Sequence, residues 1–212
     1  KDMFALMRDV EQLWQFLLDK LEKIAVSSFR RVHMRDLWRE HVGVNLDDYL
    51  DLESMTKLCM AHYSPALPAG RLPVTHYAFY EDAFYKIFLN QIEPKLTAPT
   101  IVHHYPAPMA ALAKLSDKEP GYAERVEVYA GGLELANGFT ELTDADEQLE
   151  RLRKEKRERE KMGKEVYDID MEFIEALRHM PPAAGIALGV DRLAQVLTGC
   201  QEIDDVLVLP AA

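Results

Sequence analysis

Apolar residues recur every three or four positions over residues 2–25, which is the spacing of an amphipathic helix. The positions on one face include Met3, Met7, Val10, Trp14 and Leu17. Such a stripe must be covered by other parts of the protein, and an ordinary core helix is favoured over a coiled-coil or partner helix. A second apolar helix is predicted over Thr75–Ile92, after a proline- and glycine-rich loop at residues 64–74.

From Pro99 onward the apolar period changes to two, which is typical of strands. The predicted strands are Thr100–Tyr105, Ala123–Tyr129, Gly132–Leu142, Gly185–Val190 and Asp205–Leu209. The predicted helices between and after them are Asp144–Lys161, Asp170–Met180 and Asp191–Leu197. We therefore expect an α+β fold, with residues 1–98 mainly helical and residues 99–212 forming an antiparallel sheet flanked by helices.

The predicted helix Asp144–Lys161 is the most highly charged segment of the chain. Glutamates precede basic residues by four positions, as in Glu147 with Arg151 and Glu150 with Lys154. This order stabilises an exposed helix. A solvated helix is favoured over an arm that binds RNA.

The balance of charges narrows the class of partner. The chain of 212 residues has 36 acidic and 25 basic residues, a net charge of −11, which disfavours a protein that wraps nucleic acid. Cys59 and Cys200 lie far apart, so neither a disulfide framework nor a cysteine-rich zinc site is indicated. No apolar run is long enough for a membrane span and no signal peptide is evident, so we expect a cytoplasmic protein without membrane attachment.

Two carboxylates and an amide follow one another within the predicted strand Gly132–Leu142. Glu134 and Glu141 would lie on opposite faces of a regular strand, unless a bulge at Asn137-Gly138 redirects the chain. On one surface, these groups could hold a divalent cation or pair with a substrate ammonium group. A solvated edge strand is the alternative interpretation.

Glycines alternate along the segment Gly185-Ile-Ala187-Leu-Gly189. One face of this strand would carry almost no side chains, so that a flat ring such as a purine could lie against the backbone. Arg192 follows at the start of the next helix, where its guanidinium and the helix amides both favour an anion. Close packing of strands would explain the glycines equally well.

The pair His103-His104 suggests a metal site at first. Adjacent strand residues point to opposite faces, so we expect the two rings not to chelate one ion and to serve the end of a strand instead.

The segments Glu134-Leu-Ala-Asn137-Gly-Phe-Thr-Glu141 and Gly185-Ile-Ala187-Leu-Gly189-Val-Asp-Arg192 together resemble the catalytic end of class II aminoacyl-tRNA synthetases of the lysine type. The second segment is similar to motif 3 of that class. The first segment and Ala187 are most similar to the stand-alone lysyl-tRNA-synthetase-like proteins that attach β-lysine to elongation factor P. The resemblance covers nearly all of the chain.

The resemblance implies a function and roles for individual residues. Lysine or β-lysine would be activated with ATP and Mg²⁺ as an aminoacyl-adenylate and passed to elongation factor P. Glu134 and Arg192 would be catalytic, Arg192 through the γ-phosphate. Glu134, Leu135, Gly189 and Arg192 would bind ATP, with Mg²⁺ held by Glu134 and Glu141. Asn137, Glu141 and Ala187 would line the amino-acid site.

The chain departs from the family pattern at its start. Helical periodicity is present from Met3, and motif 1, which builds the dimer interface, and motif 2, which clamps ATP, are both missing. Phe29-Arg30 imitates only two letters of motif 2 and is taken as coincidence. We therefore expect a C-terminal part of a homodimeric enzyme that is inactive by itself. The alternatives are a lysyl-tRNA synthetase that charges tRNA and a synthetase-derived binding module without catalysis.

Overall fold

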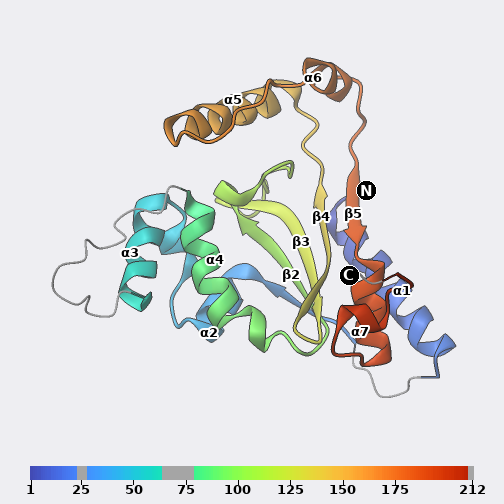
Figure 1. The fold of residues 1–212 in the computed structure, drawn as a ribbon. Helices are drawn as coiled ribbons and strands as arrows, with labels where there is room; N and C mark the ends of the chain where they lie inside the picture. The colour runs from blue at the N-terminus through green and yellow to red at the C-terminus, as the bar shows by residue number, and fades with distance from the viewer. Residues whose placement is uncertain (23–27, 64–78, 210–212) are drawn as a thin grey trace.

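The computed structural model describes residues 1–22, 28–63 and 79–209 (Figure 1). The α-helices are α1 (Met3–Lys20), α2 (Met34–His41), α3 (Leu52–Tyr63), α4 (Tyr80–Gln91), α5 (Ala145–Lys161), α6 (Met171–Leu177) and α7 (Val190–Thr198). The strands are β1 (Arg30–His33), β2 (Thr100–Pro106), β3 (Tyr122–Ala130), β4 (Leu133–Thr140) and β5 (Ala184–Leu188). The predicted loop at residues 64–74 and the first residues of the predicted helix Thr75–Ile92 lie outside the described residues.

The strands form one sheet in the order β1-β2-β3-β4-β5. All neighbours are antiparallel except β1 and β2, which are parallel. The predicted α+β class is therefore confirmed, with one parallel pair added. Strand β1 was not predicted, because it has only four residues and begins with Arg30 and Arg31, which lie at an exposed edge. These arginines pair with Glu40 and Glu11, so they are structural here.

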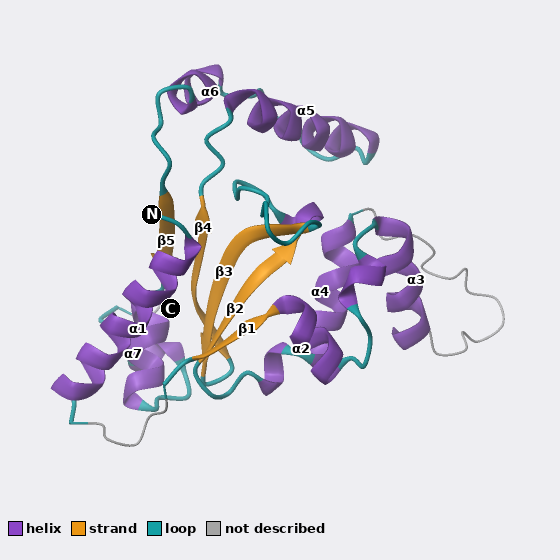
Figure 2. Ribbon diagram, turned by 180° about the vertical axis from the view of Figure 1, so that it is seen from behind, coloured by secondary structure: helices purple, strands orange, loops and turns teal. Residues whose placement is uncertain are grey.

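Helices cover the sheet on both sides, as Figure 2 shows. On one side, α2, α3 and α4 enclose a core that includes Trp38, Phe84 and Phe88 and reaches Val102 and Tyr129 of the sheet. The other core joins apolar residues of α1 and α7 to apolar residues of β3 and β4. They include Met3, Met7, Trp14, Val126, Val128, Leu135, Leu193 and Leu197. The predicted core role of the first helix is confirmed.

Helices α5 and α6 extend beyond the sheet, joined to it by the extended chain after β4 and before β5 (Figure 1), and Arg151 of α5 bonds to the backbone of Ala111 and Ala113. Asp144 caps α5 and Asp170 caps α6, each through a side-chain oxygen that accepts from backbone N–H groups. The two helices share a small core of their own around Ala145, Ile174 and Leu177. We call this unit the α5–α6 arm.

The last predicted strand, Asp205–Leu209, is wrong. The chain forms a short 3₁₀ turn at Ile203–Asp205 and then leaves Val208 and Leu209 almost fully exposed, at 95% and 88%. A run of apolar residues gives a strand only where a neighbouring strand is available for pairing. None of the described helices is both long enough and apolar enough to cross a membrane.

Candidate active site

A β-bulge brings the carboxylates of β4 to one face of the sheet. Val128 pairs with Ala136 and Tyr129 pairs with Glu134, so Leu135 is the extra residue. This shift reverses the alternation, and Glu134 and Asn137 therefore share a face that continues to Glu141. The predicted bulge exists, but it lies at Leu135 and not at Asn137-Gly138.

The extra residue itself points the other way. The Leu135 side chain is buried in the core against α1, at 2% exposure, and only its backbone remains at the site. Its carbonyl oxygen accepts a hydrogen bond of 2.8 Å from the Gly189 N–H. This bond joins the bulge to the start of α7.

The glycine-rich strand lies directly beside the carboxylate strand. Asn137 pairs with Ala187 and Phe139 pairs with Gly185, so the small residues of β5 share the face of the β4 polar groups. A Cβ atom on Gly138 would lie only 2.7 Å from the Gly185 carbonyl oxygen, so the two strands need glycine there to approach so closely. Close packing therefore requires glycine at Gly138 of β4 and not at the alternating glycines of the β5 segment, where Ala187 and Gly189 are exposed and leave a flat surface open.

Arg192 closes one end of this face. It lies in the first turn of α7, and its Nη1 donates to the Glu134 carbonyl oxygen at 2.9 Å. Burial raises the pKa of the Glu134 carboxyl, and the negative charge of Glu127 raises it further, while Arg192 opposes both. An exposed guanidinium, a half-buried carboxylate and a helix N-terminus therefore lie together.

A buried group that the sequence analysis missed lies beneath the site. The carboxylate of Glu127, 2% exposed, accepts from Arg125 Nη2 at 2.6 Å and from Asn137 Nδ2 at 3.2 Å. Its other oxygen accepts from the hydroxyls of Tyr105 and Tyr129. A carboxylate can only accept, so the Asn137 nitrogen must face it, and Asn137 Oδ1 is left buried without a partner among the described residues. The only signal in the sequence was the spacing of Arg125 and Glu127 on one face of a strand that is mainly apolar.

Glu141 occupies the opposite end of the face. Burial raises the pKa of its carboxyl, and no cation or hydrogen-bond donor contacts this carboxylate within the described ranges. A Cβ atom on Gly185 would lie 2.7 Å from Glu141 Oε1, so the glycine makes room for the carboxylate over the strand. An unpaired, half-buried carboxylate is suited to a cationic ligand.

The geometry does not favour one Mg²⁺ ion held by Glu134 and Glu141 together. Seven residues of nearly extended chain separate their Cα atoms by about 20 Å. The carboxylates whose charges raise the pKa of Glu134 are instead Glu127 and Glu93. Across residues 1–22, 28–63 and 79–209, no three acidic, histidine or cysteine side chains are arranged to hold a metal ion by themselves.

The histidine pair has a structural role, but not for the expected reason. A bulge with a positive φ of 59° at His104 turns its ring toward His103, and the two Nδ1 atoms lie 2.7 Å apart. The His33 ring stacks on His104. The rings therefore meet, and the expectation of opposite faces is wrong. Burial lowers the pKa of His33 to about 4 and that of His103 to about 3.

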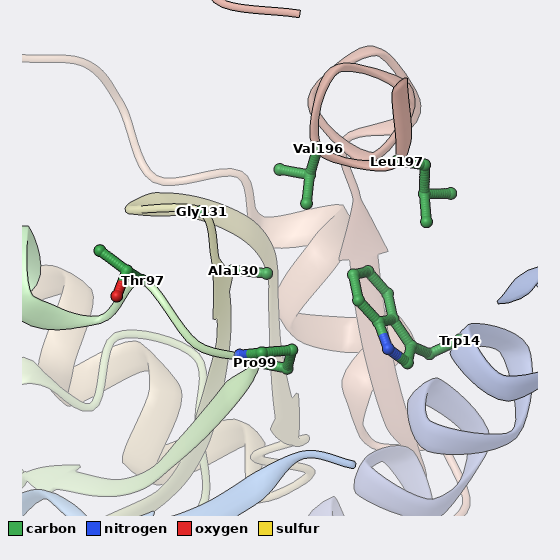
Figure 3. Close-up of a pocket in the computed structure, with 7 residues that line it drawn as sticks. All are labelled: Trp14, Thr97, Pro99, Ala130, Gly131, Val196 and Leu197. Carbon is green, nitrogen blue, oxygen red and sulfur yellow. The ribbon is translucent and has the colours of Figure 1, made fainter. Parts of the chain in front are cut away.

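A separate pocket lies between α1 and α7, at the turn that joins β3 to β4 (Figure 3). Its volume is about 180 Å³, below the roughly 300–1,000 Å³ of typical ligand sites. Its lining is Trp14, Thr97, Pro99, Ala130, Gly131, Val196 and Leu197, without a charged side chain. It therefore does not compete with the β4–β5 face as a nucleotide site.

The fold and this face define a class of protein. Residues 1–212 match the family described as tRNA synthetases class II (D, K and N). The chain belongs to this family of ligases, which in general depend on ATP and magnesium.

Particular relatives narrow the comparison to lysine. The chain is 37% identical to an elongation factor P–(R)-β-lysine ligase of Yersinia enterocolitica over 212 residues, 99% of this chain and 61% of the relative. It is 34% identical to a lysine–tRNA ligase of Listeria monocytogenes over 86% of this chain and 35% of the relative. A lysine–tRNA ligase of Mycoplasma capricolum is 32% identical over 99% of this chain and 43% of the relative. The chain thus spans about three fifths of the first relative and less than half of the other two.

Proposed function

We propose that this chain belongs to an enzyme that activates lysine or β-lysine with ATP and transfers it to elongation factor P. The observation that carries the proposal is the pairing of β4 with β5, which puts Glu134, Asn137 and Glu141 beside the glycine-lined strand that leads to Arg192. One continuous face therefore has a cationic group at one end and an unpaired carboxylate at the other. ATP and an ammonium-bearing substrate need that distribution of charge.

The end near α7 would bind the nucleotide. Gly189 offers bare backbone for the adenine ring, and Arg192 would pair with the γ-phosphate. Leu135 would take part through its backbone, because its side chain is buried in the core. Glu134 would face ATP through Mg²⁺ without the distant Glu141, and the buried negative charge of Glu127 behind it would strengthen the attraction for the cation. The metal, when bound, would neutralise phosphate charge.

The other end would bind the amino acid. Glu141 would accept from the substrate ammonium, and Asn137, whose amide is fixed by Glu127, would line this end of the site. The substrate carboxylate would attack the α-phosphate, the bond to the β-phosphate bridging oxygen would break, and pyrophosphate would leave. The residues of the chain act in this step by binding and orienting the two reactants.

The choice between elongation factor P and tRNA as the acceptor is argued from the methyl group of Ala187. Ala187 is exposed beside Asn137, where its Cβ narrows the face next to the amino-acid end. A single methyl can exclude a substrate whose backbone is displaced. Together with the similarity to the Yersinia ligase, this favours elongation factor P over tRNA. A lysyl-tRNA synthetase is the second candidate, because two of the relatives bear that activity in their names.

The deciding experiment uses the product of the complete gene. We expect pyrophosphate exchange into ATP that depends on lysine or β-lysine, followed by transfer of label to purified elongation factor P and not to tRNA. Label on tRNA alone would establish the second candidate, and no binding of ATP, Mg²⁺ or lysine by calorimetry would indicate a non-catalytic module. We expect the 212 residues alone to catalyse little exchange, and the complete protein to be a homodimer by light scattering.

A further inference from the structure

The backbone of Glu141 is flanked by a segment that belongs to no strand. Residues 110–115 run between the ends of β3 and β4, where Ala113 pairs with Glu141 and Leu115 pairs with Ala123. The Lys114 N–H donates to the Thr140 carbonyl, and the Leu142 N–H donates to the Leu112 carbonyl, each at 2.8 Å. The backbone of Glu141 is therefore held on this side by residues 110–115, which we call the wedge.

The wedge also supports the neighbouring side chain of the site. Ala110 and Ala113 are buried with Ala123, and Phe139 packs against this group. Phe139 lies between Asn137 and Glu141 on the same face of β4. A displacement of the wedge would therefore reach the amino-acid end of the site by two routes, through the Glu141 backbone and through Phe139.

The wedge is bent, and one arginine fastens the bend. Ala111 has a φ of +48°, which is unfavourable for a residue other than glycine. Arg151 Nη1 donates to the carbonyl oxygens of both Ala111 and Ala113, at 3.0 and 2.9 Å. One nitrogen can reach both oxygens only while the wedge keeps this bend, so the arginine stabilises the strained conformation.

Arg151 is itself held in place by its own helix. Its Nε and Nη2 donate to Glu147 Oε1, one turn earlier in α5, and its side chain is only 23% exposed. The rigid fork of the guanidinium makes both sets of bonds at once, which a lysine cannot do. The α5–α6 arm, which stands away from the sheet in Figure 1, is thus tied through Arg151 to the residue beside Glu141.

We propose that Arg151 is a positioning residue for the amino-acid end of the site. It holds the wedge against β4, and the wedge holds Glu141 and Phe139 where a substrate ammonium group would meet them. The inference rests on the proposed function for the identity of the ligand, but not for the mechanical link between Arg151 and Glu141.

Substitution of Arg151 by alanine tests this link, with Arg153→Ala on the same helix as the matched control. Arg153 is exposed and makes no side-chain hydrogen bond or ion pair within the described residues, and its substitution removes the same charge as that of Arg151. In the complete gene product, we expect Arg151→Ala to raise the KM for lysine about tenfold, the effect of one lost charge-assisted bond. The KM for ATP should stay unchanged, and Arg153→Ala should match the wild type. An unchanged lysine KM in Arg151→Ala would overturn the proposal.

A second measurement does not depend on activity. Amide hydrogen exchange at Lys114 and Leu142, the donors that join the wedge to β4, should be at least about tenfold faster in Arg151→Ala and unchanged in Arg153→Ala. If exchange is unchanged, the positioning role is wrong even where the enzyme is active. If amide exchange accelerates in Arg151→Ala but the wild-type enzyme shows no lysine-dependent activity, the mechanical link is supported and the proposed function is wrong.

A milder variant covers the case in which Arg151→Ala does not fold. Glu147→Gln leaves both carbonyl bonds possible but weakens the anchor of the guanidinium. Both readouts should then move in the same direction by a smaller factor, and Arg151→Lys should fall between the alanine variant and the wild type. No movement in either variant would contradict the proposal.

Discussion

Two glutamates on the same face of the sheet have opposite environments. Glu127 lies under the helices α2–α4, where four donors satisfy its carboxylate. Glu141 lies on the β4–β5 side, where no donor among the described residues reaches its carboxylate. We call the part of the face around Glu127 the covered half and the part around Glu141 the open half. The covered half uses charge to hold side chains in place, and the open half keeps its charge for a ligand.

Asn137 connects the two halves. Its nitrogen belongs to the covered network, and its oxygen has no partner among the described residues. An amide can be turned end for end at little cost in solution, but a carboxylate on one side removes that freedom. The covered half therefore fixes the orientation of the Asn137 amide and leaves its buried oxygen as the unpaired atom. The comparison predicts that changes in the open half alter activity and that changes in the covered half alter stability.

Loss of the open carboxylate should have the largest effect. Glu141→Ala would leave a substrate ammonium without its partner, at a cost of roughly 2–5 kcal/mol. We expect lysine-dependent pyrophosphate exchange by the complete protein to fall about thirtyfold or more, with no loss in the free energy of unfolding. Glu150→Ala, an exposed glutamate of α5, is the control. Equal exchange in both variants would remove Glu141 from the site.

A substitution at the contact between β4 and β5 should have the next largest effect. Gly138→Ala would put a Cβ atom 2.7 Å from the Gly185 carbonyl oxygen, a backbone atom that cannot yield without shifting β5. We expect a loss of about 1–3 kcal/mol in the free energy of unfolding, measured by chemical denaturation. Gly189→Ala is the matched control, because its added Cβ would meet only ordinary contacts at 3.6 Å or more. A destabilisation of equal size in the control would refute the special role of Gly138.

Some elements of the fold could be predicted from the sequence and others could not. Helices α1 and α5 and strands β2–β4 followed from strong periodicity, which burial of one face enforces. Strand β1 is too short and too basic to show a pattern, and the apolar run at Asp205–Leu209 had no partner strand. In both cases the outcome depended on neighbours distant in the sequence.

The candidate site could also be predicted only in part. The Glu134–Glu141 segment and Gly185–Arg192 together carry the resemblance, and the strand pairing places them side by side. The bulge at Leu135 and the network around Glu127 require the register between β3 and β4, which no local pattern specifies. A separate bulge in the β2–β3 pair, with a positive φ at His104, is why His103 and His104 meet, against expectation.

The buried histidines of β1 and β2 should make the stability of the protein depend on pH. Burial holds the pKa of His33 and His103 below the ordinary value of 6.5, at about 4 and about 3. Between pH 6.5 and 4 the unfolded chain therefore binds protons that the folded chain excludes, and the free energy of unfolding falls as the pH falls. We expect His103→Asn to reduce this loss by about 1–2 kcal/mol in denaturation curves at pH 7 and 4.5. His179→Asn, at a residue whose side chain is 79% exposed, should leave the slope unchanged, and an equal effect of both variants would contradict the assignment.

The smallest effect should come from the one methyl group on the open strand. Ala187→Gly removes it from an exposed position, so the fold loses little, while the face beside Asn137 becomes wider. If the methyl group excludes one lysine isomer, the ratio of kcat/KM for β-lysine to that for lysine should shift toward lysine by about tenfold, near the lower limit for one methyl because the position is exposed. Glycine at position 187 would then admit lysine, whose backbone is displaced relative to that of β-lysine. The choice of substrate would thus depend on a single Cβ atom. An unchanged ratio, with both rates intact, would move selectivity to another part of the face and leave Glu141 and Asn137 to bind either isomer alike.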